Sequence, residues 1–211
     1  MEQIITELQV DFFKNGWCEI KPELIGFSNN ISDSISRIKK SEYQLSAKNL
    51  GIFSLPQKRI NEHRIFNQIF KNESFINYVE IITGRRLEIS CIMQMLTIGE
   101  SKSLQWHRDS YSRGNNFIGP IPQVVKLMLL NETVTNQDGP FQVISGSHIL
   151  DFNNKVFDKI LPFIKMKDIK SFSCKKNTCI LFDGRILHRR LFSTKKAKRS
   201  VTIISLTSPY K

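Results

Sequence analysis

The chain has 211 residues, of which 40% are hydrophobic and 24% are charged, as in an ordinary soluble protein with one domain-sized core. No apolar run approaches the ~20 residues that a membrane-spanning helix needs, and the acidic first residues do not resemble a signal peptide, so we expect a cytoplasmic protein. The net charge of +12 favours an anionic substrate or partner.

The first 85 or so residues are expected to be mostly helical. Apolar side chains recur at helical spacing from Ile4 to Phe13, and more weakly from Ile31 to Ile38. Asn72 is a suitable N-cap for a further helix over residues 73–83, and Gly84 stands where a helix commonly ends. We expect these helices to form a supporting layer.

From Leu87 the hydrophobic period changes to two, which is typical of a half-buried strand. The alternating residues are Leu87, Ile89, Cys91, Met93 and Met95. Short strand-like runs follow near residues 104–108, 124–131, 141–145, 178–183 and 199–206. Turn-forming sequences separate them at residues 113–116, 137–140 and 183–184. Many short strands at this spacing predict a β-sandwich or barrel.

Residues 151–170 are expected to form an irregular or partly helical insertion. We therefore predict one domain over residues 1–211, with a helical layer over 1–85 packed on a β-barrel over 86–211. The basic excess lies late in the chain: residues 1–150 carry 16 Lys/Arg and 15 Asp/Glu, whereas residues 151–211 carry 15 and 4. This charge either attracts an anionic substrate or is a solvated lysine-rich surface.

The four cysteines, Cys18, Cys91, Cys174 and Cys179, include no CxxC pair. Cysteines of this kind in a reducing compartment are expected to be free thiols. No disulfide framework is therefore predicted.

Two histidines and one aspartate form the candidate metal site. His107 and Asp109 are two positions apart, so on an extended segment both side chains point to the same face. His188 is distant in sequence, so only folding would complete the set. Two imidazoles and one carboxylate form the facial triad of non-heme Fe(II) oxygenases, which leaves other metal positions open. An HxD pair also occurs by chance, and a lone buried histidine is more often structural than a ligand.

Two basic residues are candidates to bind an anionic co-substrate. An Fe(II) oxygenase needs, besides O₂, an electron-rich co-substrate such as 2-oxoglutarate, whose distal carboxylate requires a cation. Arg199 lies 11 residues after His188 and offers a planar guanidinium that matches a carboxylate, unless it is an ordinary basic residue after the preceding lysines. Lys126 interrupts the apolar run over residues 124–130, where it either extends to the surface or points into a polar cavity.

Four sequence segments, taken in their order along the chain, form a specific pattern. Residues 12–17 (FFKNGW) place aromatic residues before a Gly-Trp pair, and residues 105–109 (QWHRD) contain a WHxD motif. Residues 138–148 (DGPFQVISGSH) and 181–188 (LFDGRILH) follow, with Ser145 where proline is usual. In this order, over nearly the whole chain, the segments resemble the phytanoyl-CoA dioxygenase family of Fe(II)/2-oxoglutarate oxygenases.

The resemblance implies a mainly β fold with a double-stranded β-helix (jelly-roll) core and an N-terminal helical layer. The iron ligands that it implies are His107, Asp109 and His188. It also implies that Arg199 holds 2-oxoglutarate and that Gln94 and Lys126 contact this co-substrate. Together with O₂, such a site would hydroxylate a small molecule. His148 is not a ligand in this mapping and is expected to have a structural role in a turn.

One departure from the family concerns the substrate. Two positions after the distal histidine the family often has a small hydroxyl residue, whereas this chain has Arg190. On a strand, Arg190 would share the cavity face of His188. Arg113 lies in a Gly/Asn-rich loop, where barrel folds often carry specificity residues. We therefore predict a small anionic or zwitterionic substrate read by both arginines. In the alternative interpretation they brace the barrel rim or pair with Asp183.

Three other functions are alternatives to hydroxylation. A halogenase of this class lacks the ligand carboxylate, which Asp109 would supply here. A nucleic-acid or modified-base demethylase would suit the basic C-terminal third. The alkylation-repair dioxygenases, however, carry a second arginine six residues after the first, where this chain has Ser205. A jelly-roll binding protein without catalysis is the non-enzymatic alternative.

Overall fold

The computed structural model describes residues 2–27, 30–109, 124–150 and 155–209, and in these residues it contains ten strands, six α-helices and four short 3-10 helices. The strands are β1 (Trp17–Ile20), β2 (Gln44–Ala47), β3 (Ile52–Ser54), β4 (Glu88–Ile98), β5 (Val124–Leu130), β6 (Phe141–Ile144), β7 (Ile169–Phe172), β8 (Cys179–Asp183), β9 (His188–Arg190) and β10 (Lys198–Thr207). The helices are α1 (Glu2–Asn15), α2 (Asn30–Ser36), α3 (Gln57–Glu62), α4 (Arg64–Phe70), α5 (Glu73–Thr83) and α6 (Lys155–Ile164).

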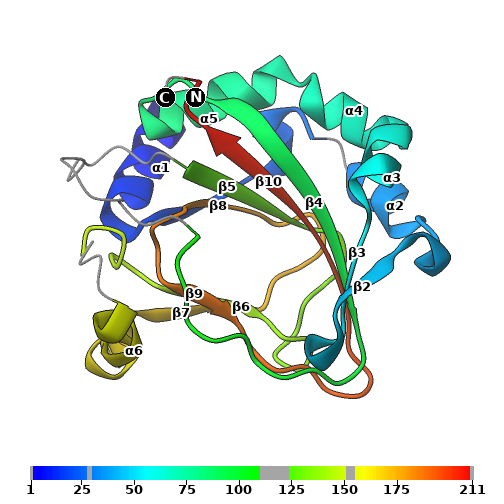
Figure 1. Cartoon of the computed structure of the whole chain (residues 1–211). Coiled ribbons are helices and arrows are strands. Elements are labelled where there is room, and N and C mark those ends of the chain that lie inside the picture. The colour runs from blue at the N-terminus through cyan, green and yellow to red at the C-terminus, as the bar shows by residue number, and fades with distance from the viewer. Residues whose placement is uncertain (1, 28–29, 110–123, 151–154, 210–211) are drawn as a thin grey trace.

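Two antiparallel sheets face each other, as in a jelly roll (Figure 1). The larger sheet has seven strands in the order β1-β8-β5-β10-β4-β3-β2, and the smaller has three in the order β7-β6-β9. Helices α1–α5 cover the outer face of the larger sheet, while α6 lies beside the smaller sheet (Figure 1). The predicted mainly β fold with a helical layer is therefore confirmed.

The cap signals in the sequence correctly located α5. The Asn72 side chain accepts a hydrogen bond from the backbone N–H of Phe75 at 3.0 Å, and Gly84 ends the helix with a φ of +65°. Phe75, Val79 and Ile82 are buried against the larger sheet. Within the described residues, no helix is both long and apolar enough to cross a membrane.

The alternation of side chains along the larger sheet separates two apolar clusters. One cluster lies between this sheet and the helices and includes Val125, Leu127 and Leu129 of β5. The other lies between the two sheets and includes Met128 and Leu130 from the same strand. Because successive side chains point to opposite faces of a sheet, residues of the second parity face the inside of the jelly roll.

The first 85 residues are mostly helical, as expected, and they also contribute three short strands to the larger sheet. Strand β1 pairs with β8 at one edge of the larger sheet, and β3 and β2 extend the other edge beyond β4. These strands have only three or four residues, too few to establish a period of two. The run over residues 104–108 forms no strand, although His107 makes an isolated bridge to His188. The short strand β7 was not predicted, whereas β9 contains His188 and Arg190, which were expected to share a strand.

Candidate active site

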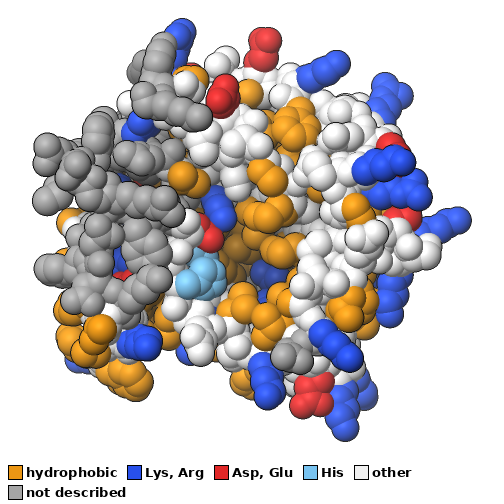
Figure 2. Space-filling view, viewed as in Figure 1, with side chains coloured by type: hydrophobic (Ala, Val, Ile, Leu, Met, Phe, Trp, Pro, Cys, Tyr) orange, Lys and Arg blue, Asp and Glu red, His pale blue; other side chains and the backbone are white. Residues whose placement is uncertain are grey.

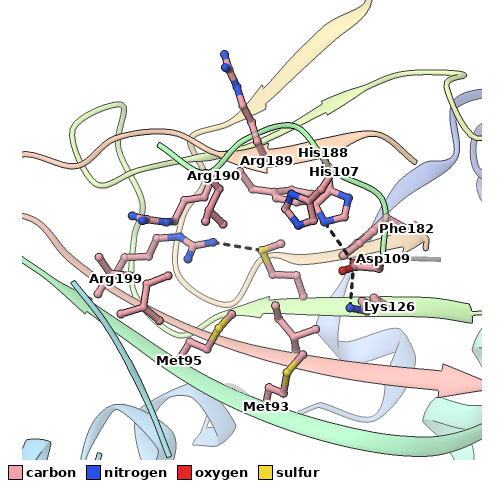
Figure 3. A pocket seen from close by; sticks show the side chains of 16 residues that line it. Met93, Met95, His107, Asp109, Lys126, Phe182, His188, Arg189, Arg190 and Arg199 are labelled. Carbon is pink, nitrogen blue, oxygen red and sulfur yellow. Dashed lines mark hydrogen bonds and ion pairs between the residues drawn. The ribbon is translucent and has the colours of Figure 1, made fainter. Parts of the chain in front are cut away.

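The three candidate metal ligands come together in space. His188 is the first residue of β9, and the segment that carries His107 and Asp109 runs antiparallel beside it. The ligand atoms of His107, Asp109 and His188 all lie within 4.8 Å of one another. Figure 3 shows both imidazoles and the carboxylate directed toward a common space. The fold thus brings the HxD pair and the distant histidine together, as the sequence predicted.

Both imidazoles are held in the same way by backbone oxygens. The Nδ1 atom of His107 lies 2.8 Å from the carbonyl oxygen of Gln105, and Nδ1 of His188 lies 2.9 Å from that of Ile186. A carbonyl oxygen can only accept, so each Nδ1 carries the proton. In the neutral rings the lone pair is then on Nε2, the atom available to a metal. Burial, and next the charge of His188, lowers the pKa of His107 and favours its neutral form.

Asp109 completes this donor set as a carboxylate. Its Oδ2 lies 3.3 Å from Nε2 of His188 and 2.9 Å from Nζ of Lys126. Burial opposes ionisation, but the hydrogen bonds and charges of His188 and Lys126 outweigh it and hold the pKa of Asp109 well below its usual range. Two imidazole nitrogens and one carboxylate fit a divalent first-row metal. Lys126 lines the cavity with its Nζ beside Asp109, so it does not extend to the surface.

The three residues line one side of a cavity of about 210 Å³ between the two sheets. Its other walls are mainly apolar and include Met93, Met95, Met128, Phe141, Phe182 and Ile203. Figure 2 shows the mouth as a hollow with a histidine at its edge and apolar side chains around it. Such walls exclude water, which strengthens every electrostatic interaction inside the cavity.

Arg199 supplies a buried cation to this cavity. It is only 4% exposed and, within the described part of the chain, forms no ion pair with a carboxylate. One guanidinium nitrogen lies 3.7 Å from the sulfur of Met128, and its Nε has no hydrogen-bond partner there (Figure 3). Burial, and then the charge of Arg190, lowers its pKa to about 9. A buried charge of this kind is costly unless an anion joins it.

Arg190 lines the same cavity but is already partly bound by the chain. Its guanidinium donates to Ser101 Oγ at 2.5 Å and to the carbonyl oxygens of Lys102 and Leu50 at 3.1 and 3.3 Å. Arg190 thus lines the cavity and also braces its rim, and its role in substrate binding stays a prediction. It does not pair with Asp183, whose partner is Arg185 at 2.6 Å.

Gln94 does not lie in the cavity, which corrects its implied role as a co-substrate contact. It has the opposite parity on β4 from Met93 and Met95, which line the cavity. Its fully buried amide instead bonds with Ser200 Oγ at 2.9 Å and Thr202 Oγ1 at 2.6 Å on the helix side of the sheet. The parity of the apolar residues before it could have revealed this. Arg113 lies outside the described residues.

Sequence analysis missed the role of Arg108, which lies between two of the candidate ligands. Its side chain points away from them and is buried, with Nε 2.9 Å from Asp158 Oδ1 of α6. It also donates to the carbonyl oxygens of Ser147, at 2.8 Å, and Arg185. These hydrogen bonds fix the backbone of the HxD segment. No local sequence pattern predicts this role of Arg108, because Asp158 is 50 residues away.

The remaining two histidines take structural positions, as expected for His148. His148 is buried and its Nε2 lies 3.1 Å from the carbonyl oxygen of Phe13. Its ring packs so closely on Gly16 that a Cβ there would lie 2.5 Å from Nδ1. His63 pairs with Glu42 at 2.9 Å. Neither belongs to the metal-ligand group.

A jelly roll whose cavity holds two histidines, one aspartate and a buried arginine defines the class of Fe(II)- and 2-oxoglutarate-dependent oxygenases. The family model described as phytanoyl-CoA dioxygenase (PhyH) matches residues 44–190 of the chain. The chain belongs to this family, whose enzymes typically use Fe(II), 2-oxoglutarate and O₂. No curated protein matches its sequence.

Solved structures share the fold at low identity. HygX from Streptomyces hygroscopicus, solved with nickel and 2-oxoglutarate bound, has a TM-score of 0.74 at 13% identity, covering 97% of this chain and 87% of that one. AviO1 from Streptomyces viridochromogenes Tue57 has a TM-score of 0.71 at 12% identity, covering 97% and 95%. EctD from S. alaskensis, solved with bound Fe, has a TM-score of 0.66 at 14% identity, covering 96% and 76%. These structures support the jelly-roll assignment.

Proposed function

We propose that this enzyme hydroxylates a small anionic or zwitterionic metabolite, and that His107, Asp109 and His188 hold its Fe(II). One observation carries the proposal: the three donors and the buried guanidinium of Arg199 line a single cavity. The metal, once bound with 2-oxoglutarate and O₂, supplies the oxidising power for inserting oxygen into a C–H bond. The chain itself supplies orientation and electrostatics.

Arg199 is the proposed anchor for the distal carboxylate of 2-oxoglutarate. Its position deep in the cavity and its lack of a described carboxylate partner leave a planar fork available for a carboxylate. Lys126 lies at the other end, beside Asp109, and is proposed to contact the part of 2-oxoglutarate nearest the metal. The two cations thus set the direction in which the co-substrate lies.

The substrate is proposed to enter with only its reactive end. The cavity of about 210 Å³ is smaller than the ~300–1,000 Å³ typical of sites for drug-sized ligands, and 2-oxoglutarate would occupy part of it. The apolar walls would hold the C–H bond and keep water away, while Arg190 at the rim would attract a negative group. Arg113 is proposed as a second contact on sequence grounds alone.

The test is a screen for succinate release from the iron-loaded enzyme. Carboxylated, phosphorylated and neutral metabolites of matched size are each offered with 2-oxoglutarate, and products are analysed by mass spectrometry. A product heavier by one oxygen atom, absent from His188→Ala, would support hydroxylation. Stoichiometric succinate with a product that has gained no oxygen would contradict hydroxylation, and a preference for neutral compounds would contradict the proposed substrate charge.

A further inference from the structure

Helix α6 turns an apolar face to solvent. Ile160, Phe163 and Ile164 are exposed, Phe163 by 76% and Ile164 by 66%, and Met166 continues this surface just after the helix. The adjoining side of α6 is used for packing, because Leu161 is buried with Ile144 and Leu187 of the barrel. The apolar surface of the helix is therefore wider than the part that serves the protein core.

Lysines surround this apolar surface. Lys159, Lys167 and Lys170 are exposed, and Lys165 pairs with Asp168 at 3.0 Å. The acidic residue of the helix interior, Asp158, points inward to Arg108 and so does not offset these charges at the surface. We call Ile160, Phe163, Ile164, Met166 and the exposed lysines Lys159, Lys167 and Lys170 the α6 surface.

We propose that the α6 surface binds an anionic phospholipid bilayer from one side, as a peripheral contact. Apolar side chains next to lysines are the composition of helices that lie in the interface plane, with the apolar groups at the acyl boundary and the cations at the phosphates. The charge argues against a second copy of the chain, because a symmetric contact would bring identical lysines together. It likewise requires that the lipid be anionic.

The position of α6 links this contact to the candidate active site. The buried pair between Asp158 and Arg108 ties the helix to the segment between His107 and Asp109. The apolar side chains at the lower left of Figure 2 lie on the same face of the molecule as the cavity mouth. A bilayer bound at α6 would thus hold the mouth at a fixed place beside the membrane surface.

Flotation of the full chain with vesicles tests the proposal. The vesicles contain either 30% phosphatidylserine in phosphatidylcholine or phosphatidylcholine alone, at low and at high salt. We expect binding to the anionic vesicles, weakened by salt, and little binding to the neutral ones. The double variant Phe163→Ser/Ile164→Ser should reduce partitioning more than ~10-fold, as should Lys159→Glu/Lys167→Glu.

Matched variants separate this surface from general effects. Val10→Ser/Leu45→Ser removes two other exposed apolar side chains, and Lys58→Glu/Lys195→Glu makes the same change in net charge elsewhere. Both should bind like the unchanged protein. Equal loss in these controls, equal binding to neutral vesicles, or no binding at all would overturn the proposal. So would a dimer in sedimentation velocity that Phe163→Ser/Ile164→Ser converts to a monomer, because a second copy would then cover the surface.

Discussion

The backbones of His107 and His188 exchange two hydrogen bonds. The N–H of His107 donates to the carbonyl of His188 at 3.0 Å, and the N–H of His188 donates to the carbonyl of His107 at 2.9 Å. Outside this bridge, the guanidinium of Arg189 stacks on the Trp106 ring at 4.4 Å. Two segments 81 positions apart are thus locked in register, and their imidazole centroids lie 4.3 Å apart. The backbone geometry thus positions these two candidate metal ligands.

The first prediction concerns iron binding. Replacing His107, Asp109 or His188 singly with alanine should weaken Fe(II) binding by more than ~100-fold, because changes to residues that merely support ligands already cost 10–100-fold. The measurement is iron per chain after anaerobic reconstitution. His63→Gln is the control, since His63 lies outside the group, and should keep one iron. Full iron content in the alanine variants would remove these residues as ligands.

Arg199→Met should weaken the binding of 2-oxoglutarate and stabilise the ligand-free protein. In the ligand-free protein it removes an unpaired buried charge, so the melting temperature should rise, by roughly 2–4 °C for each kcal/mol gained. Because the charged partner of 2-oxoglutarate is lost, its affinity should fall by about 3–5 kcal/mol. Thermal melts with and without 2-oxoglutarate measure both effects. A variant that 2-oxoglutarate still stabilises would move the anchor to Lys126, because Lys198 lies outside the cavity and pairs with Glu132.

The difference in stability between Arg199→Met and the unchanged protein should depend on pH. Burial and the charge of Arg190 lower the pKa of Arg199 from its ordinary range to about 9, so the folded state disfavours the protonated form. The cost is fully present at pH 7 and is relieved as the pH rises through about 9, where the unfolded chain binds more protons. The advantage of Arg199→Met over the unchanged protein should therefore shrink between about pH 8 and 10. A constant difference in melts across this range would contradict the lowered pKa.

Arg190→Gln should impair substrate use more than cofactor binding. Arg190 lies on the cavity wall two residues from His188, but its described contacts are with the rim and not with the donors. We expect kcat/KM for an anionic substrate to fall by about 10-fold or more, the value of 1.4 kcal/mol, with Fe(II) and 2-oxoglutarate affinities nearly unchanged. Arg189→Gln, whose side chain points out of the cavity in Figure 3, should have a smaller effect. Equal losses in both variants would argue that Arg190 only braces the rim.

Arg108 should matter for stability as much as a core residue. Arg108→Met leaves Asp158 buried without its partner and should destabilise the fold by about 3–5 kcal/mol. Asp158→Asn keeps an acceptor and should cost less. Urea unfolding measures both variants. Arg59→Met, which breaks the exposed pair with Glu62, should change stability by less than ~1 kcal/mol. A cost for Arg108→Met no larger than for this control would contradict its proposed role.

Local patterns sufficed wherever the determining interactions are close in sequence. The cap at Asn72, the period of two from Leu87 and the HxD pair each depend on neighbours within a few residues, and the structure contains all three. The predicted role of His188 came from its place in an ordered set of segments. The roles of individual residues at the metal and co-substrate remain predictions for the experiments above.

Only the tertiary structure decided on which face of the sheet each side chain lies and which residues it contacts there. Gln94 and Lys126 were assigned the same role, yet opposite strand parities send one to the helix layer and the other into the cavity. The pairing of Arg108 with Asp158 and the solvent-facing side of α6 depend on contacts between distant segments. A sequence specifies such contacts only through the whole fold, because the free energy that selects them is the burial and pairing of groups that are not neighbours in the chain.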